Sequence, residues 1–127
     1  MFSLSFQGFY HEQSRPDRDD YVSVQWANIV SGKRDDPDRK ITLLNIHRLK
    51  LGAENNFNKY SDADIDTLKT SYDYGSVMHY GDTDFTSNGL RTIIPTQDPS
   101  AEIGQRRGMS DIDILEVQRY YGCVAIP

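Results

Sequence analysis

The chain has 127 residues, of which 37% are hydrophobic, 11% aromatic and 26% charged, and its formal net charge is −5. This length suits one domain, and so many large apolar residues exclude a disordered tail or linker. Because Lys and Arg are interleaved with Asp and no basic stripe exists, nucleic acid is excluded as a partner. No apolar run approaches the roughly 20 residues that span a bilayer, so no membrane partner is expected.

The first part of the chain predicts one extended segment. Residues 1–7, MFSLSFQ, lack a basic region and a small-residue cleavage site, so we expect no signal peptide in this chain. In residues 21–30, the alternation of apolar and polar side chains around Val22, Val24 and Trp26 predicts a short strand. Residues 31–51 pass from a charged, proline-containing run to an apolar stretch, whose periodicity leaves helix and strand both open.

Residues 52–108 are rich in Asn, Asp, Gly and Tyr, which predicts long ordered loops. One hairpin is expected across residues 86–94, because Asn88-Gly89 is a signal for a type I′ turn. The acidic stretch SDADID, residues 61–66, lacks the Gly and terminal Glu of a calcium-binding loop and is interpreted as surface.

The last predicted element is a helix from about 111 to 121. Ser110 and Asp113 have the spacing of a capping box, and Gly122 is a stop signal. Cys123 follows this helix and is the only cysteine, so it is either an inert thiol or half of a bridge whose partner is absent.

Two motifs carry chemistry. Gly8 and His11 have the spacing Gly-x-x-His, and Met78 lies two residues before Tyr80 in SYDYGSVMHYG. The long zinc signature of metzincin peptidases, His-Glu-x-x-His-x-x-Gly-x-x-His, ends in this way and is followed by a turn that contains a methionine. Its first two histidines lie one helical turn apart, and its glycine lets the chain turn back with the third.

Further blocks follow in order, namely GFYHEQSRPDRDDYV, NFNKY, YDYGSVMHYG and DPSAEIGQRRGMSDIDILEVQRYYGC. With them the chain resembles the astacin family of zinc metalloendopeptidases, most closely its hatching-enzyme type. The resemblance implies an α+β, metzincin-like fold, represented here by a loop-rich C-terminal lobe with one C-terminal helix and without the N-terminal sheet lobe. We therefore expect an N-terminally truncated, astacin-like peptidase domain at residues 8–123, with a non-family start at 1–7 and an insertion at about 31–51.

The resemblance also implies roles for single residues. His11 matches the third zinc-binding histidine, and Gly8 matches the glycine of the zinc signature. Tyr80 matches a tyrosine that sits at the metal in the resting state and stabilises the oxyanion during peptide hydrolysis. Met78 matches the apolar floor of the site. Glu12 matches a glutamate that receives the new N-terminus after propeptide removal.

Five further positions are interpreted, of which only Cys123 follows from the same resemblance. Arg106 and Arg107 are either solvated side chains of a loop or contacts for an acidic side chain of the substrate. Cys123 matches a cysteine that pairs with one near the N-terminus of the catalytic domain. His47 is interpreted as a solvated side chain, and His79 as a polar filler in the turn rather than a metal ligand.

The chain departs from the zinc signature at its start. Counting back from His11, the positions of the first histidine, the glutamate and the second histidine hold Met1, Phe2 and Ser5. A catalytic zinc needs about three protein ligands and a glutamate that takes a proton from the bound water. Zinc is thus the expected cofactor, but two ligands and the general base are missing, so we expect no hydrolysis by this chain alone.

Two functions remain open. The chain is either part of a secreted zinc-dependent metalloendopeptidase that acts on proteins or peptides, or a non-catalytic fragment or pseudo-enzyme that binds a peptide or partner protein. The missing N-terminal lobe is the expected intramolecular partner. Residues 1–7 and 31–51 are interpreted as translated intron, since MFSLSFQ can be encoded by a pyrimidine-rich tract ending in CAG and Gly32-Lys33 by GGTAAG.

Overall fold

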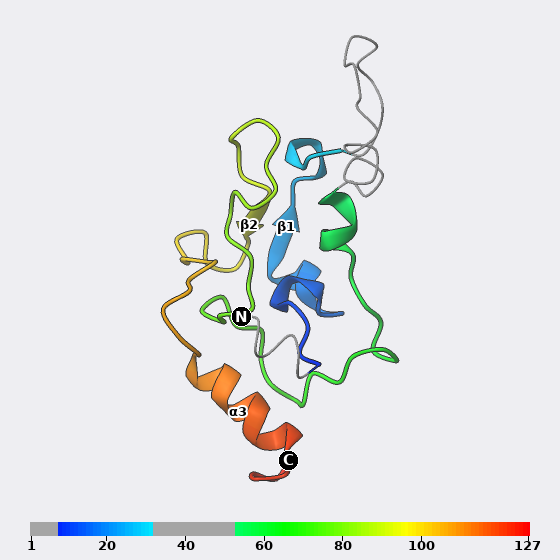
Figure 1. Ribbon diagram of the computed structural model, residues 1–127, viewed down its shortest axis with the longest axis vertical. Coiled ribbons are helices and arrows are strands. Elements are labelled where there is room, and N and C mark those ends of the chain that lie inside the picture. The colour runs from blue at the N-terminus through cyan, green and yellow to red at the C-terminus, as the bar shows by residue number, and fades with distance from the viewer. Residues whose placement is uncertain (1–7, 32–52) are drawn as a thin grey trace, which may run out of the picture.

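The computed structural model describes residues 8–31 and 53–127, and regular structure is sparse in them (Figure 1). Two short strands, β1 (Val22–Val24) and β2 (Ile93–Pro95), lie side by side. One α-helix, α3 (Asp111–Tyr120), lies at the end of the molecule away from them (Figure 1). Short 3-10 helices complete the described elements: Glu12–Ser14, Arg18–Asp20, Trp26–Asn28 and Ala53–Phe57.

The extended segment predicted near residue 22 is confirmed over three residues. Val22 is buried and Ser23 is exposed, as the alternating pattern requires. The strand β1 pairs antiparallel with β2, with Val22 opposite Pro95 and Val24 opposite Ile93. Trp26 lies beyond the strand in a 3-10 helix, so the strand is shorter than the alternation alone indicates.

The hairpin predicted across residues 86–94 is wrong. A type I′ turn needs positive φ at both central residues, and Gly89 has φ +81° while Asn88 is outside the left-handed region. The hydroxyl of Thr86 instead closes a polar loop by accepting the backbone N–H of Gly89 at 3.1 Å. Thr86 forms an isolated bridge with Ile29, and β2 pairs with β1 rather than with its neighbour in sequence.

The predicted C-terminal helix is confirmed, with its end at Tyr120. Ser110 accepts the backbone N–H of Asp113, and the Asp113 carboxylate accepts the backbone N–H of Ser110, so both halves of the capping box are present. Gly122 adopts φ +72°, a conformation that glycine reaches without a steric penalty, and the chain leaves the helix there.

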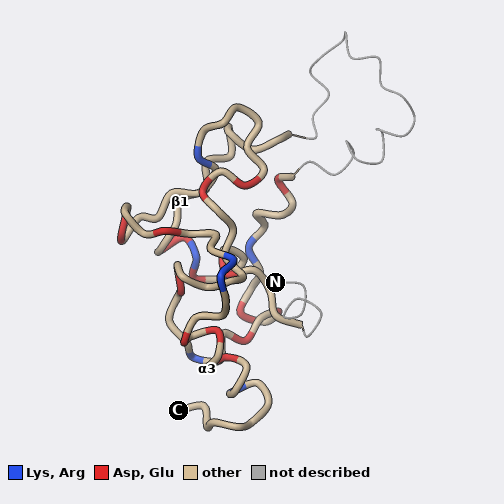
Figure 2. Tube along the Cα trace, turned by 60° about the vertical axis from the view of Figure 1, so that its left-hand side comes forward, with Lys and Arg blue, Asp and Glu red and all other residues tan. Residues whose placement is uncertain are grey.

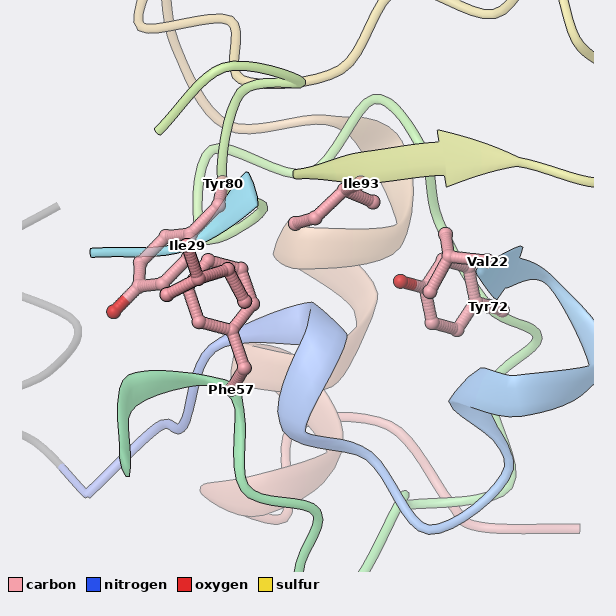
Figure 3. Packing of buried hydrophobic residues seen from close by; sticks show 6 residues of the cluster. All are labelled: Val22, Ile29, Phe57, Tyr72, Tyr80 and Ile93. Carbon is pink, nitrogen blue, oxygen red and sulfur yellow. The ribbon is translucent and has the colours of Figure 1, made fainter. Parts of the chain in front are cut away.

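The buried core consists of six side chains that come from both strands and from the loops (Figure 3): Val22, Ile29, Phe57, Tyr72, Tyr80 and Ile93. Phe57 and Ile93 are fully buried. A smaller cluster of Val77 and Met78 packs against Phe9 and Val117, which connects residues 76–80 to α3. The long loops predicted for residues 52–108 contain the 3-10 helix Ala53–Phe57 and the strand β2, and between these elements the described residues are ordered by packing.

Charged residues do not segregate on the fold, since Figure 2 shows basic residues interspersed with acidic ones along the trace. None of the helices in the described ranges has the length and apolarity to cross a membrane. Residues 1–7 and most of the predicted insertion at 31–51, including His47, lie outside the described residues.

Candidate functional site

The site forms where His11 meets the turn that contains Met78. His11 is the N-cap of the 3-10 helix Glu12–Ser14, and its Nδ1 lies 2.9 Å from the backbone carbonyl oxygen of Met78. Because a carbonyl can only accept, Nδ1 carries the proton and donates it, and the lone pair of Nε2 is left free. A hydrogen bond of this kind fixes the tautomer and orientation of a metal-binding imidazole.

The environment of His11 favours the neutral ring that a metal needs. Desolvation lowers the pKa of His11 below its ordinary value, against the opposing effect of the Met78 carbonyl. The backbone N–H of Glu12 also donates to the Met78 carbonyl, at 3.3 Å, so the two segments are joined by two hydrogen bonds. The motifs that the sequence separates by 67 residues are thus in direct contact, as the zinc signature predicts.

Tyr80 lies beside this imidazole. The centroids of the His11 and Tyr80 rings are 4.4 Å apart, and Tyr80 also packs edge-on against Phe57. Its backbone N–H donates to the side-chain oxygen of Gln13 at 3.1 Å. In Figure 3 the phenol oxygen of Tyr80 points away from the other five side chains of the core.

His79 has no free nitrogen. The hydroxyl of Tyr72 lies 2.7 Å from Nε2, and the carbonyl oxygen of Tyr80 lies 2.7 Å from Nδ1. The carbonyl requires a proton on Nδ1, so Nε2 accepts from Tyr72. Burial lowers the pKa of His79 to about 4, which keeps the ring neutral. This geometry agrees with its interpretation as a polar filler.

The turn around Met78 is held by the N-terminal cap of α3. One carboxylate oxygen of Asp113 accepts the hydroxyl of Ser76 at 2.6 Å, and the other accepts the backbone N–H of Val77 at 2.9 Å. Met78 itself is buried in the small cluster with Val77 and Val117. Asp113 therefore caps the helix and anchors the turn, and the capping-box pattern predicted only the first role.

Glu12 belongs to a buried network of charged and polar groups. It accepts the backbone N–H of Asp73 at 2.8 Å and lies 3.4 Å from the guanidinium of Arg15. Arg15 also contacts Asp17 at 2.9 Å and Glu116 at 3.8 Å. Burial dominates over these contacts and raises the pKa of Glu12 to about 8. A cavity of about 260 Å³ adjoins Glu12, Arg15 and Glu116.

The remaining predicted residues take different positions. Gly8 is exposed with φ +92°, a backbone conformation that favours glycine. Arg106 donates to backbone carbonyls of the Met78 turn. Arg107 is exposed and lies 3.6 Å from Glu102. Cys123 is exposed and free. The roles predicted for these residues, and for Glu12, stay predictions.

The described residues do not complete a zinc site. His11 offers one imidazole nitrogen and Tyr80 one phenol, whereas zinc is held by about four ligands. Within residues 8–31 and 53–127, no group of three or more His, Cys, Asp or Glu side chains could hold a metal ion. Among the described residues, His11 and Tyr80 therefore do not by themselves make up a metal centre.

Comparison with known proteins places this geometry in a family. The model of the astacin family of peptidases matches residues 4–36 and 31–122. The zinc metalloproteinase nas-13 of Caenorhabditis elegans is 44% identical over 116 residues, which are 91% of this chain and 21% of that protein. The low choriolytic enzyme of Oryzias latipes is 42% identical over 116 residues, which are 91% of this chain and 34% of that protein.

A solved structure supports the fold. High choriolytic enzyme 1 of Oryzias latipes, a hatching enzyme zinc-protease, matches with a TM-score of 0.68 and 38% identity over 91% of this chain and 47% of that one. The fold is therefore astacin-like. This chain spans 17–31% of the length of nas-13 and two further zinc metalloproteinases of Caenorhabditis elegans, nas-15 and nas-4, and about half of the matched structure.

Proposed function

The chain belongs to the astacin family of peptidases, and from this membership we propose that it is part of a zinc-dependent metalloendopeptidase that hydrolyses peptide bonds in proteins. The observation that carries the proposal is the arrangement of His11. Its Nδ1 donates to Met78, its Nε2 is free, and the ring of Tyr80 lies 4.4 Å away. Relatives are named zinc metalloproteinase in Caenorhabditis elegans and low choriolytic enzyme in Oryzias latipes, and meprin A subunit beta of Homo sapiens is 43% identical over 118 residues.

In this proposal each residue has a separate task. His11 supplies one metal ligand, and Met78 holds its ring in place through the backbone carbonyl. Tyr80 presents its hydroxyl to the substrate oxyanion, where a single well-placed donor contributes on the order of 3 kcal/mol to catalysis. Arg106 and Arg107 remain candidates for contact with an acidic substrate side chain. Glu12 lies behind the site and remains a candidate for binding a free N-terminus.

The same arrangement argues against hydrolysis by this chain alone. The positions that precede Gly8 in the zinc signature hold Met1, Phe2 and Ser5, none of which supplies an imidazole or a carboxylate. The missing ligands and the general base must come from another segment, and we propose an N-terminal lobe as that partner. The proposed domain is residues 8–123, interrupted at about 31–51. Secretion and protein substrates are proposed from the hatching-enzyme relatives.

A second candidate function follows because the zinc-binding residues of this chain are incomplete. The chain would then be a non-catalytic protein of the family that binds a peptide or partner protein without cleaving it. The single free imidazole nitrogen favours this alternative for the chain by itself.

The test uses the chain as printed and a second polypeptide that carries the His-Glu-x-x-His segment of low choriolytic enzyme. We expect no stoichiometric zinc and no cleavage of casein by the chain alone, and chelator-sensitive cleavage when both polypeptides are combined. His11→Gln should abolish zinc retention and cleavage in the combined sample, whereas Tyr80→Phe should retain zinc and lose cleavage. Zinc and turnover in the chain alone would refute its inactivity. Absence of both in the combined sample would refute the peptidase proposal in favour of the binding protein.

A further inference from the structure

Three consecutive backbone carbonyls in the Met78 turn accept hydrogen bonds from two different side chains. The guanidinium Nη1 of Arg106 donates to the carbonyl oxygens of Val77 at 3.2 Å and His79 at 2.9 Å. The carbonyl between them, that of Met78, accepts instead from Nδ1 of His11 at 2.9 Å. Arg106 thus binds the carbonyls of Val77 and His79, and the carbonyl of Met78 between them binds the imidazole of His11.

Further hydrogen bonds fix the position of Arg106 and of the loop that carries it. Its Nη1 also donates to the carbonyl oxygen of Gln105 at 2.8 Å, so one nitrogen serves three acceptors. The side-chain amide of Gln105 donates to the carbonyls of Gly75 and Gly108, which fixes the loop that carries Arg106. The adjacent Arg107 points elsewhere, to the exposed Glu102.

The turn is therefore hydrogen-bonded to two side chains of opposite charge, Asp113 and Arg106. The Asp113 carboxylate binds the hydroxyl of Ser76 and the N–H of Val77, and the Arg106 guanidinium binds the carbonyls of Val77 and His79. Hydrogen bonds to charged groups are roughly twice as strong as those between neutral groups. Such contacts can fix the peptide planes of a segment without helix or strand.

We propose that Arg106 is a positioning residue for His11. By holding the carbonyls of Val77 and His79, it directs the carbonyl of Met78 to Nδ1 of His11 and so keeps Nε2 unprotonated and available to a metal. The relevance to a metal rests on the proposed function, but the effect on the imidazole does not. Arg106 then acts on the turn, whereas its predicted role was contact with an acidic substrate side chain.

The experiment measures the tautomer of His11 by NMR in the 127-residue chain with labelled histidine, above the ordinary imidazole pKa of about 6.5. Comparison with His11→Gln identifies the signals of His11. We expect one tautomer with the proton on Nδ1 in the unchanged chain. Arg106→Met should lose this single tautomer and give a mixture, and Arg107→Met, the matched control, should retain it.

Two further measurements keep the proposal testable if Arg106→Met does not fold. Arg106→Lys keeps the charge, but its single ammonium lacks the planar fork of the guanidinium, so a partial loss of the tautomer is expected. In the unchanged chain, the Nη protons of Arg106 should be resolved because hydrogen bonds restrict rotation of the guanidinium, while those of Arg107 should be averaged. An unchanged tautomer in a folded Arg106 variant would overturn the proposal, and so would averaged Nη signals of Arg106.

The two proposals can fail separately. A shift of the tautomer in Arg106→Met together with no zinc and no cleavage in the combined polypeptides would leave Arg106 as a positioning residue and remove the peptidase function. Chelator-sensitive cleavage together with an unchanged tautomer would do the reverse.

Discussion

The buried carboxyl of Glu12 makes the pH dependence of stability predictable. Burial raises the pKa of Glu12 from 4.5 to about 8, so the folded protein retains a proton that the unfolded chain has already lost. The stability from this proton is fully present below about pH 4.5 and is lost as the pH rises to about 8. Each pH unit in that window lowers the free energy of unfolding by about 1.4 kcal/mol.

His79 contributes the opposite slope over a lower range. Burial lowers the pKa of His79 from 6.5 to about 4, so the unfolded chain binds the extra proton and stability rises with pH until about 6.5. Between about pH 4.5 and 6.5 the slopes of Glu12 and His79 roughly cancel. Above pH 6.5 only the slope of Glu12 remains, which gives a net loss of about 2 kcal/mol by pH 8.

Two weaker shifts reinforce this profile without reversing it. Burial also raises the pKa of Glu116, which adds to the loss at higher pH, and desolvation lowers the pKa of His11, which adds to the gain at lower pH. The profile should therefore show a plateau or a shallow maximum near pH 6.5 and a decline above it.

The variant Glu12→Gln isolates the contribution of the carboxyl. Glutamine keeps an oxygen that can accept the N–H of Asp73 but cannot ionise. Urea unfolding followed by the fluorescence of Trp26, the only tryptophan, gives the free energy at each pH. We expect a nearly flat profile above pH 6.5 for Glu12→Gln and the unchanged decline for Glu102→Gln, whose side chain is 86% exposed. If Glu12→Gln declines like the unchanged chain, Glu12 is not the titrating group.

Four further variants test the packing and the turn. Phe57→Ala should lower the free energy of unfolding by about 3–5 kcal/mol because Phe57 is fully buried. A loss under about 1 kcal/mol in urea unfolding would contradict the burial of Phe57 in the core. Gly104→Ala should lower the free energy of unfolding by about 1–3 kcal/mol in the same assay. The added Cβ would lie 2.3 Å from the Cα of Gly81, and the φ of +81° at Gly104 disfavours alanine. Ser110→Ala should lower the free energy of unfolding by about 0.5–2 kcal/mol because it removes a helix cap. Asp113→Ala should lower it further, because this substitution also removes the hydrogen bond to the N–H of Val77 in the Met78 turn. Equal losses in the two variants would contradict the role of Asp113 in anchoring the turn.

Local signals in the sequence predicted the elements that local interactions form. The capping box of Ser110 and Asp113 spans three residues and needs no distant partner, so the helix was predicted with its cap. The alternation around Val22 predicted β1 for the same reason. The Asn88-Gly89 signal failed because the hydroxyl of Thr86 provides a competing local hydrogen-bond partner.

The site could be predicted only in part. The resemblance to the metzincin family placed His11 and Met78 together, and the local pattern of residues alone does not contain this contact between distant segments. No sequence signal indicated that Tyr72 binds His79 or that Arg106 binds the carbonyls of Val77 and His79. These contacts depend on the direction of side chains in loops, which neither periodicity nor propensity determines.

Loops that carry a site lack the regular backbone hydrogen bonds of helices and strands, so other contacts must keep them in place. Buried backbone groups outside helices and strands still need partners, and here charged side chains provide them. Asp113 binds the N–H of Val77, Arg106 binds the carbonyl of the same residue, and Arg15 binds the carbonyls of Thr70 and Ser71. Because each charge serves several backbone groups, loss of one side chain releases more than one peptide unit. A site of this construction should therefore be more sensitive to substitution of Asp113 or Arg106 than to substitution of the exposed Arg107.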